Sequence, residues 1–302
     1  MKTLLNRSVA AIGLFAYFVA SSALAIVDGQ PDVSDHPYVG LVVVYDADGN
    51  PLWRCSGTLL SPTLFLTAAH CTAPDPDTGE TPVSARVYFD FDVPAANPFI
   101  PGEEPGDPPI SLGYPFVGGV TGTPMANPLF PGYIIPPNSH DVGVVILDEP
   151  VQTVYPTITE YAVLPRLGAL DTLSVQRGRQ TTEFDVVGYG LQYIRDNPIF
   201  GPVFLEAYPA RVQATVRLVN LRNALTDGYN IQHSGDSGGG NSFGGSCFGD
   251  SGGPIFLSGS NVIVGITSFG FNDNCTGPGF AYRTDIAETQ DYLEYVVEML
   301  AD

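Results

Sequence analysis

Short runs of β-branched and aromatic residues alternate with turn residues along most of the chain from Ile26 onward. Runs of this length, bounded by Gly, Pro, Asn and Asp, are typical of strands in antiparallel barrels or sandwiches. The predicted strands are Tyr38–Tyr45, Leu59–Thr67, Arg86–Phe91, Val142–Leu147, Phe184–Tyr189, Ala210–Val219, Ile255–Leu257 and Val262–Phe269. The pattern therefore predicts an all-β protein.

The last segment of the chain has the periodicity of a helix instead. Between about 285 and 300, apolar residues recur at helical spacing while acidic residues occupy the other positions. The predicted apolar face comprises Ile286, Tyr292, Tyr295, Val296 and Leu300. One C-terminal helix is thus expected beside the β-structure.

The first 25 residues follow the pattern of a secretory signal peptide. The first seven residues carry two positive charges, at Lys2 and Arg7, and a mostly apolar run covers Val9–Ala20. Ala23-Leu24-Ala25 then matches the A-x-A pattern of a signal cleavage site. The apolar run is too short for a comfortable membrane span, which disfavours an uncleaved anchor. We expect a secreted, extracellular protein with no membrane partner, whose mature chain begins at Ile26.

The composition is strongly acidic, with 32 Asp and Glu against 12 Lys and Arg and a net charge of −20. This charge argues against nucleic acid or an anionic membrane as a partner. Four cysteines in an exported chain indicate two disulfides, for which three pairings are possible. The expected bridges join the cysteines closest in sequence, Cys55 with Cys71 and Cys247 with Cys275.

The stretch 92–137 is crowded with Pro and Gly and is interpreted as long surface loops between strands. Glu103, Glu104 and Asp107 within it could ligate calcium, but they lack the spacing of an EF-hand loop. The chain also has no C-x-x-C pair or compact Cys/His cluster. We therefore expect no metal and no cofactor.

One pentapeptide that can hold an activated serine occurs twice, at Gly235–Gly239 and again at Gly249–Gly253. Small neighbours let a carbonyl group approach the serine, and backbone N–H groups there can bind an oxyanion. The nucleophile elbow of α/β-hydrolases needs its histidine after the serine. Every histidine of this chain precedes both serines: His36, His70, His140 and His233. The elbow is excluded, and a subtilisin-like fold is disfavoured because alternating helices are missing.

The remaining order, His then Asp then Ser, closely resembles the trypsin/chymotrypsin family of serine proteases. The segments that carry the resemblance are Thr67–Cys71, Asn138–Leu147 and Cys247–Pro254, with Ile26–Gly29, Val187–Gly190 and Thr267–Gly270 in support. Asp28 stands where the family usually has Gly. The family's fold has two antiparallel six-stranded β-barrels with the active site between them, here about 26–152 and 153–284, followed by the C-terminal helix.

The resemblance implies a catalytic triad of His70, Asp141 and Ser251 and an oxyanion hole formed by the N–H groups of Gly249 and Ser251. Ser251 is preferred over Ser237, because only Ser251 has a cysteine four residues before it and apolar strands after it. The neighbour of Asp141, His140, should point to the opposite face of an extended segment. His36 and His233 lie in polar, turn-like sequence and are expected at the surface.

In this family a new α-amino group pairs with the aspartate before the nucleophile, which implies a pair between Ile26 and Asp250. Because the signal cleavage site directly precedes Ile26, we predict that signal removal creates this amine without a zymogen step. The substrate pocket implied by the family comprises Gly245, Ser246, Phe248, Ser268, Phe269, Gly270 and Gly279. Ser268 is also expected to support Asp141.

Gly245 stands where trypsin-like members carry an acid, and Gly270 and Gly279 are too small to block the pocket. The expected enzyme is a monomeric serine endopeptidase that cleaves protein or peptide substrates after large apolar or aromatic residues. Two alternatives remain: a catalytically inactive binding protein with the protease fold, and a secreted esterase on the same fold.

Overall fold

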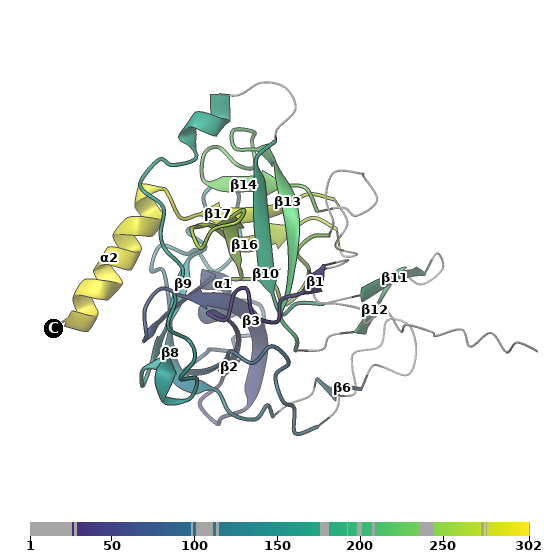
Figure 1. The fold of residues 1–302 in the computed structure, drawn as a ribbon, viewed down its shortest axis with the longest axis vertical. Coiled ribbons are helices and arrows are strands. Elements are labelled where there is room, and N and C mark those ends of the chain that lie inside the picture. Colours follow the sequence, from purple (N-terminus) through teal and green to yellow (C-terminus); the bar gives the residue numbers. More distant parts are fainter. Residues whose placement is uncertain are drawn as a thin grey trace, which may run out of the picture.

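The computed structural model describes residues 26, 29–97, 99–100, 111–112, 115–175, 181–191, 193–197, 201–206, 209–235, 244–272, 275 and 277–301. Two barrels dominate it, one above the other in Figure 1. The predicted signal peptide, the candidate calcium ligands and Ser237 lie outside the described residues.

The N-terminal barrel closes in the strand order β2-β3-β4-β9-β8-β5. Its strands are β2 (Val39–Tyr45), β3 (Pro51–Leu59), β4 (Leu64–Thr67), β5 (Ser84–Tyr88), β8 (Val120–Ala126) and β9 (Gly143–Leu147). The single strand expected over Leu59–Thr67 is wrong, because a turn at Ser61 and Pro62 separates β3 from β4. The Ser61 hydroxyl accepts the N–H of Leu64 at 3.1 Å, which stabilises this turn.

The C-terminal barrel has the order β13-β10-β15-β16-β17-β14, and β14 pairs again with β13 to close it. Its strands are β10 (Glu183–Gly188), β13 (Val212–Asn220), β14 (Asn230–His233), β15 (Pro254–Leu257), β16 (Ile263–Gly270) and β17 (Gly279–Arg283), with β1 (Gln30–Pro31) added at the edge of β13. Both barrels are antiparallel and six-stranded, so the predicted fold class is confirmed.

Smaller elements lie outside the barrels. They are the hairpins β6 (Phe99–Ile100) with β7 (Ser111–Leu112) and β11 (Tyr193–Asn197) with β12 (Gly201–Glu206), the short helix α1 (Ala69–Thr72), and the 3₁₀ turns η1 (Val151–Thr153) and η2 (Asp171–Val175). Helix α1 follows β4 directly and contacts β3, β8 and β9. It therefore lies at the end of the N-terminal barrel.

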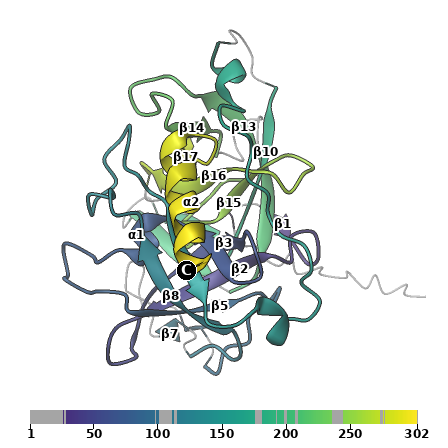
Figure 2. The same cartoon turned by 90° about the vertical axis from the view of Figure 1, so that its left-hand side faces the viewer.

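The C-terminal helix α2 (Ala287–Ala301) runs down one side of the molecule, from the end of β17 toward the N-terminal barrel (Figure 2). Its buried residues are Thr289, Tyr292, Leu293 and Val296. The Tyr292 hydroxyl donates to the carbonyl oxygen of Met125 in β8 at 2.8 Å. The expected face is wrong at Tyr295 and Leu300, which are 55% and 44% exposed. The helix thus ties the chain end to the first barrel.

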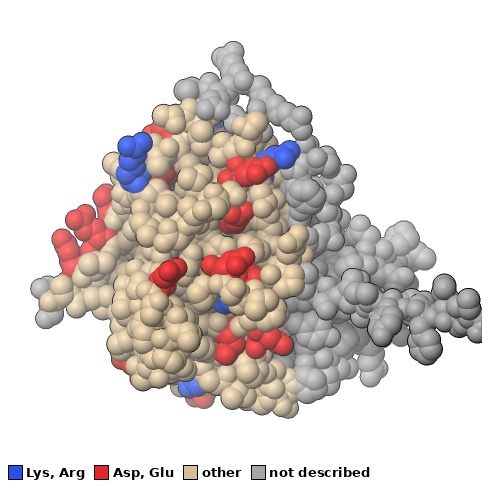
Figure 3. All heavy atoms as spheres, in the orientation of Figure 1, with Lys and Arg blue, Asp and Glu red and all other residues tan. Residues whose placement is uncertain are grey.

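Both disulfides have the predicted pairing, Cys55–Cys71 and Cys247–Cys275. The first joins β3 to α1, and the second anchors the segment before Ser251 to the loop after β16. On the face drawn in Figure 3, acidic side chains are more prominent than basic ones, as the composition predicts. None of the helices in the described part of the chain is long and apolar enough to cross a membrane.

Candidate active site

Strand pairing brings His70 and Asp141 together. Strands β4 and β9 pair with Thr67 opposite Gly143, so α1 after β4 lies beside the segment before β9. Nδ1 of His70 lies 2.9 Å from Oδ2 and 3.1 Å from Oδ1 of Asp141. The backbone N–H of His70 also donates to Oδ1 at 2.9 Å. The carboxylate therefore fixes both the position of this residue and the orientation of its ring.

Asp141 is fully buried and receives a third donor from the other barrel. The hydroxyl of Ser268 in β16 donates to Oδ2 at 2.5 Å. Burial alone would raise the pKa of Asp141, but the His70 imidazole and these hydrogen bonds hold it below its ordinary value. The ion is thus stabilised by its partners. The predicted support of Asp141 by Ser268 is present.

His70 has the opposite balance of effects. Burial acts to lower its pKa, but the charge of Asp141 and the hydrogen bond to it raise the pKa above its ordinary value. The side chain remains 23% exposed, while that of Asp141 is 0% exposed. An imidazole in this position can take a proton from a group in the adjoining pocket and hold it as imidazolium.

Ser251 lies in a tight loop between Cys247 and β15, and two glycines give the loop its shape. Gly249 and Gly252 have positive φ angles of 93° and 78°. A β-carbon at Gly252 would lie 2.0 Å from Oγ1 of Thr67 and 2.5 Å from the carbonyl oxygen of Ser56. Glycine is therefore required there both for the backbone conformation and for the close approach of the N-terminal barrel.

Ser56 of β3 holds this loop across the junction between the barrels. Its hydroxyl donates to the carbonyl oxygen of Gly249 at 2.8 Å and accepts the N–H of Tyr189 at 2.9 Å. Its own N–H donates to the carbonyl oxygen of Ser251 at 2.8 Å. No sequence motif marks Ser56, whose role depends on its position beside Cys55 and against the loop that carries Ser251.

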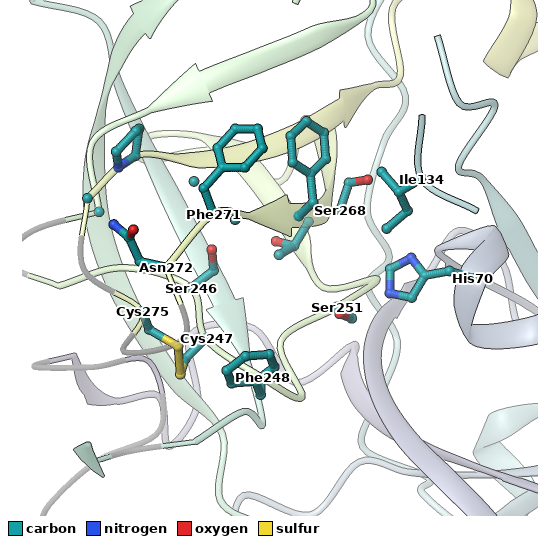
Figure 4. Close-up of a pocket in the computed structure, with 17 residues that line it drawn as sticks. His70, Ile134, Ser246, Cys247, Phe248, Ser251, Ser268, Phe271, Asn272 and Cys275 are labelled. Atoms are coloured by element: carbon teal, nitrogen blue, oxygen red, sulfur yellow. A yellow bond between two sulfur atoms is a disulfide. The ribbon is translucent and has the colours of Figure 1, made fainter. Parts of the chain in front are cut away.

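Ser251 and His70 line one pocket of about 300 Å³, and Figure 4 shows the imidazole directed toward the serine. The pocket extends from them toward the second disulfide. Six of the predicted pocket residues line it: Ser246, Phe248, Ser268, Phe269, Gly270 and Gly279. Ile134, at the end of the Pro- and Gly-rich stretch, also reaches it beside His70.

Gly245 lies behind this lining. A β-carbon on Gly245 would come within 2.6 Å of the Cα of Gly235, which itself lines the pocket. The wall at Gly270 is open, since a β-carbon there would meet nothing within 4 Å. At Gly279 the pocket is not open in this way, because a β-carbon would meet the imidazole of His233.

Two histidines expected at the surface are buried. His36 is 9% exposed, and its ring stacks on Phe256. Its Nδ1–H donates to the Asp32 carboxylate oxygen Oδ2 at 2.7 Å. His233 is 0% exposed. His36 and His233 have polar neighbours in sequence, so the local sequence does not indicate that distant segments bury these rings. His140 has the positive φ of 51° rather than an extended conformation, yet its ring is not the partner of Asp141.

Asp250 is fully buried, and its carboxylate accepts the N–H groups of Gly190 at 2.8 Å and Cys247 at 2.9 Å. Burial raises the pKa of Asp250 to about 7, although these N–H groups and the charge of Arg54 act to lower it. Ile26 is also fully buried, among the apolar residues of the C-terminal barrel. In the full-length chain its nitrogen is still in a peptide bond and carries no charge.

The described residues contain one grouping of potential metal ligands, formed by Cys55, His70 and Cys71. The two sulfur atoms are bonded to each other in a disulfide, so they are unavailable as thiolate ligands. This grouping is therefore explained without a metal ion.

Comparison with known proteins agrees with this geometry. A solved structure titled as a collagenase shares the fold, with a TM-score of 0.59 and 19% sequence identity over 92% of this chain and 99% of that one. The family model described as Trypsin matches residues 138–292, which include Asp141, Ser251 and every pocket-lining residue except His70 and Ile134. Since the match covers more than half of its residues, the chain belongs to the trypsin family of serine proteases.

Proposed function

We propose that this chain is a secreted serine endopeptidase that uses His70, Asp141 and Ser251. The observation that carries the proposal is the arrangement around one pocket. Asp141 receives hydrogen bonds from the ring and backbone of His70, and His70 faces the pocket that Ser251 also lines. The same residues suit a mechanism that needs neither metal nor cofactor.

In the proposed reaction, Oγ of Ser251 attacks the scissile carbonyl carbon while Nε2 of His70 takes the hydroxyl proton. The C–N bond then breaks, and the proton passes from His70 to the leaving amine. In the second half, His70 takes a proton from the water that attacks the acyl carbon. The ester C–O bond to Oγ of Ser251 then breaks, the carboxylic acid product leaves, and His70 returns the proton to Oγ. Asp141 keeps its charge throughout, because it holds Nδ1–H and stabilises the imidazolium.

The developing oxyanion would be bound by the N–H groups of Gly249 and Ser251. The positive φ of Gly249 and the hydrogen bond from Ser56 to its carbonyl oxygen support this assignment, since both fix the peptide units of the loop. Losing one such donor generally costs about 3–4 kcal/mol of transition-state stabilisation.

Signal removal would release the α-amino group of Ile26 and complete the active enzyme. Asp250 is a buried carboxylate whose pKa is raised, so a cationic partner would stabilise its charged form. The two disulfides and the trypsin family are typical of secreted proteins, which supports export of the chain. We further propose a monomer that does not bind nucleic acid or membranes.

For substrate preference, we propose large apolar or aromatic side chains before the cleaved bond. Phe248, Phe269 and Phe271 line the pocket, and the wall at Gly270 is open. Flat apolar groups would replace water there at little cost.

Peptide hydrolysis by the mature protein tests the proposed function. Ser251→Ala should abolish turnover of a peptide library, while Ser237→Ala in the first pentapeptide should leave it unchanged. Ester substrates measured in parallel distinguish a peptidase from an esterase. A wild-type protein that folds, starts at Ile26 and cleaves no peptide would contradict the proposal.

A further inference from the structure

A buried histidine lies against the lining of the proposed substrate pocket. His233 ends β14 and pairs directly with Gly279, the first residue of β17. Residues opposite each other in an antiparallel pair place their side chains on the same face of the sheet. The imidazole of His233 therefore lies on the side of these strands that a side chain at position 279 would occupy, and Gly279 itself lines the pocket.

The imidazole occupies the space that a side chain at position 279 would need. A β-carbon on Gly279 would lie 2.5 Å from Cε1 and 2.7 Å from Nε2 of His233, and 3.1 Å from Oγ of Ser246. Ser246 lines the pocket as well. The edge of the imidazole and the serine hydroxyl therefore converge on the space above the Cα atom of Gly279.

The hydrogen bond on the far side of the ring fixes its tautomer. Nδ1 lies 2.8 Å from the carbonyl oxygen of Ser234, which can only accept, so Nδ1 carries the proton. Nε2 of the neutral ring is then an acceptor. It is buried and has no hydrogen-bond partner among the described residues. A buried polar atom without a partner is costly, and a bound side chain that donates to it recovers that cost.

We propose that His233 determines specificity within the proposed protease function: its Nε2 accepts the phenolic O–H of a tyrosine side chain before the cleaved bond, and the Ser246 hydroxyl donates to the phenol oxygen. Tyrosine fits because its ring suits a pocket lined by Phe269 and Phe271, and its hydroxyl ends the side chain with a donor. Phenylalanine offers no donor, and glutamate offers only acceptors at neutral pH.

The test uses the mature protein and peptides that differ only in the residue before the cleaved bond: Tyr, Phe, Gln or Glu. We expect kcat/KM for Tyr to exceed that for Phe about tenfold, the value of one net hydrogen bond in a buried site. His233→Phe keeps a ring of similar size and removes the acceptor, so the ratio should fall to about one while the Phe peptide is still cleaved. His36→Phe, which removes a buried imidazole away from the pocket, should leave the ratio unchanged.

Equal rates on Tyr and Phe peptides in the wild type would overturn the assignment, and so would a preference for Gln or Glu. A second measurement does not depend on catalysis: p-cresol should bind Ser251→Ala about tenfold more tightly than toluene. Equal binding of the two compounds would refute the role of His233 even in a protein that cleaves peptides. Failure of all peptide cleavage with selective p-cresol binding would instead refute the protease function alone.

Discussion

The imidazole of His70, which lines the pocket, and that of His233, which lies against the pocket residue Gly279, differ in the oxygen that faces Nδ1. His70 faces the Asp141 carboxylate, whose charge raises the pKa of the ring despite burial. His233 faces only the Ser234 carbonyl, and burial lowers its pKa to about 4. In the proposed mechanism the first ring accepts a proton, while the lowered pKa of the second keeps it neutral at neutral pH. A histidine thus suits the proposed proton transfer at position 70 and the proposed role as a neutral hydrogen-bond acceptor at position 233.

The two buried aspartates of the site show the same contrast. Asp141 has a partner that becomes cationic, and its pKa is held below the ordinary value. Asp250 in the full-length chain has backbone donors and the more distant influence of Arg54, and its pKa rises to about 7. Each buried acid therefore takes the protonation state that its neighbours allow. A change in the charge of a neighbouring group should therefore shift the pKa of either aspartate.

The largest effect is expected from Asp141→Asn, which makes the partner of His70 neutral. Turnover should fall about ten-thousandfold, because the ring loses its stabilised imidazolium and its fixed tautomer. The remaining activity should also reach half its maximum at lower pH, since the charge that raises the pKa of His70 is gone. A pH profile of kcat checks both effects. Loss of activity below tenfold would show that Asp141 is not the triad acid.

Blocking the N-terminal amine should have the next largest effect. In a chain that keeps Ala25 before Ile26, the Ile26 nitrogen is an uncharged amide and the α-amine lies one residue away. The pair with Asp250 then cannot form, and the oxyanion hole is expected to lose its order. We expect kcat to fall about 100- to 1000-fold, the usual effect of losing oxyanion stabilisation. The matched control is the chain that starts at Ile26, and full activity of the extended chain would contradict the proposed pair.

The pH dependence of stability sharpens this comparison. In the extended chain the pKa of Asp250 is about 7 when folded and near its ordinary value of 3.8 when unfolded. The folded state therefore holds more protons between these values, and its stability should decrease by about 3 kcal/mol as the pH rises from 4 to 7. Urea unfolding of Ser251→Ala proteins with and without Ala25 measures the difference. The mature form should lack this loss, and identical curves would show that Ile26 does not reach Asp250.

Much of this site could be predicted from local sequence. Sequence motifs predict His70, Asp141 and Ser251 as neighbours. In the structure His70 lies just after β4, Asp141 just before β9 and Ser251 just before β15. The cysteine count left three pairings open, and the expected pairing of the cysteines closest in sequence is the one observed. Such predictions are possible because each depends on a few adjacent residues whose types are restricted by backbone geometry or by chemistry.

Residues whose surroundings come from distant strands were harder to predict. His233 has polar neighbours in sequence, and its burial depends on the pairing of β14 with β17 opposite a glycine. Leu293 rather than Tyr295 faces the barrel, because the rotation of α2 is set by contacts such as that between Tyr292 and Met125. Ser56 likewise has no motif of its own. Its role depends on hydrogen bonds to Gly249 and Tyr189, which are distant from it in the sequence.

The smallest effect is expected at Ser56, which joins the barrel that supplies His70 to the loop that holds Ser251. Ser56→Ala removes the hydroxyl contacts to Gly249 and Tyr189 and leaves buried backbone groups without that partner. We expect kcat to fall about tenfold with little change in KM, because the loop loses order while the pocket keeps its shape. Thr58→Ala is the matched control, since it removes a buried hydroxyl from the same strand that contacts Tyr38 instead. If both variants lower the unfolding temperature equally and only Ser56→Ala lowers kcat, the serine positions the loop. If kcat is unchanged in both, the junction between the barrels is ordered without it.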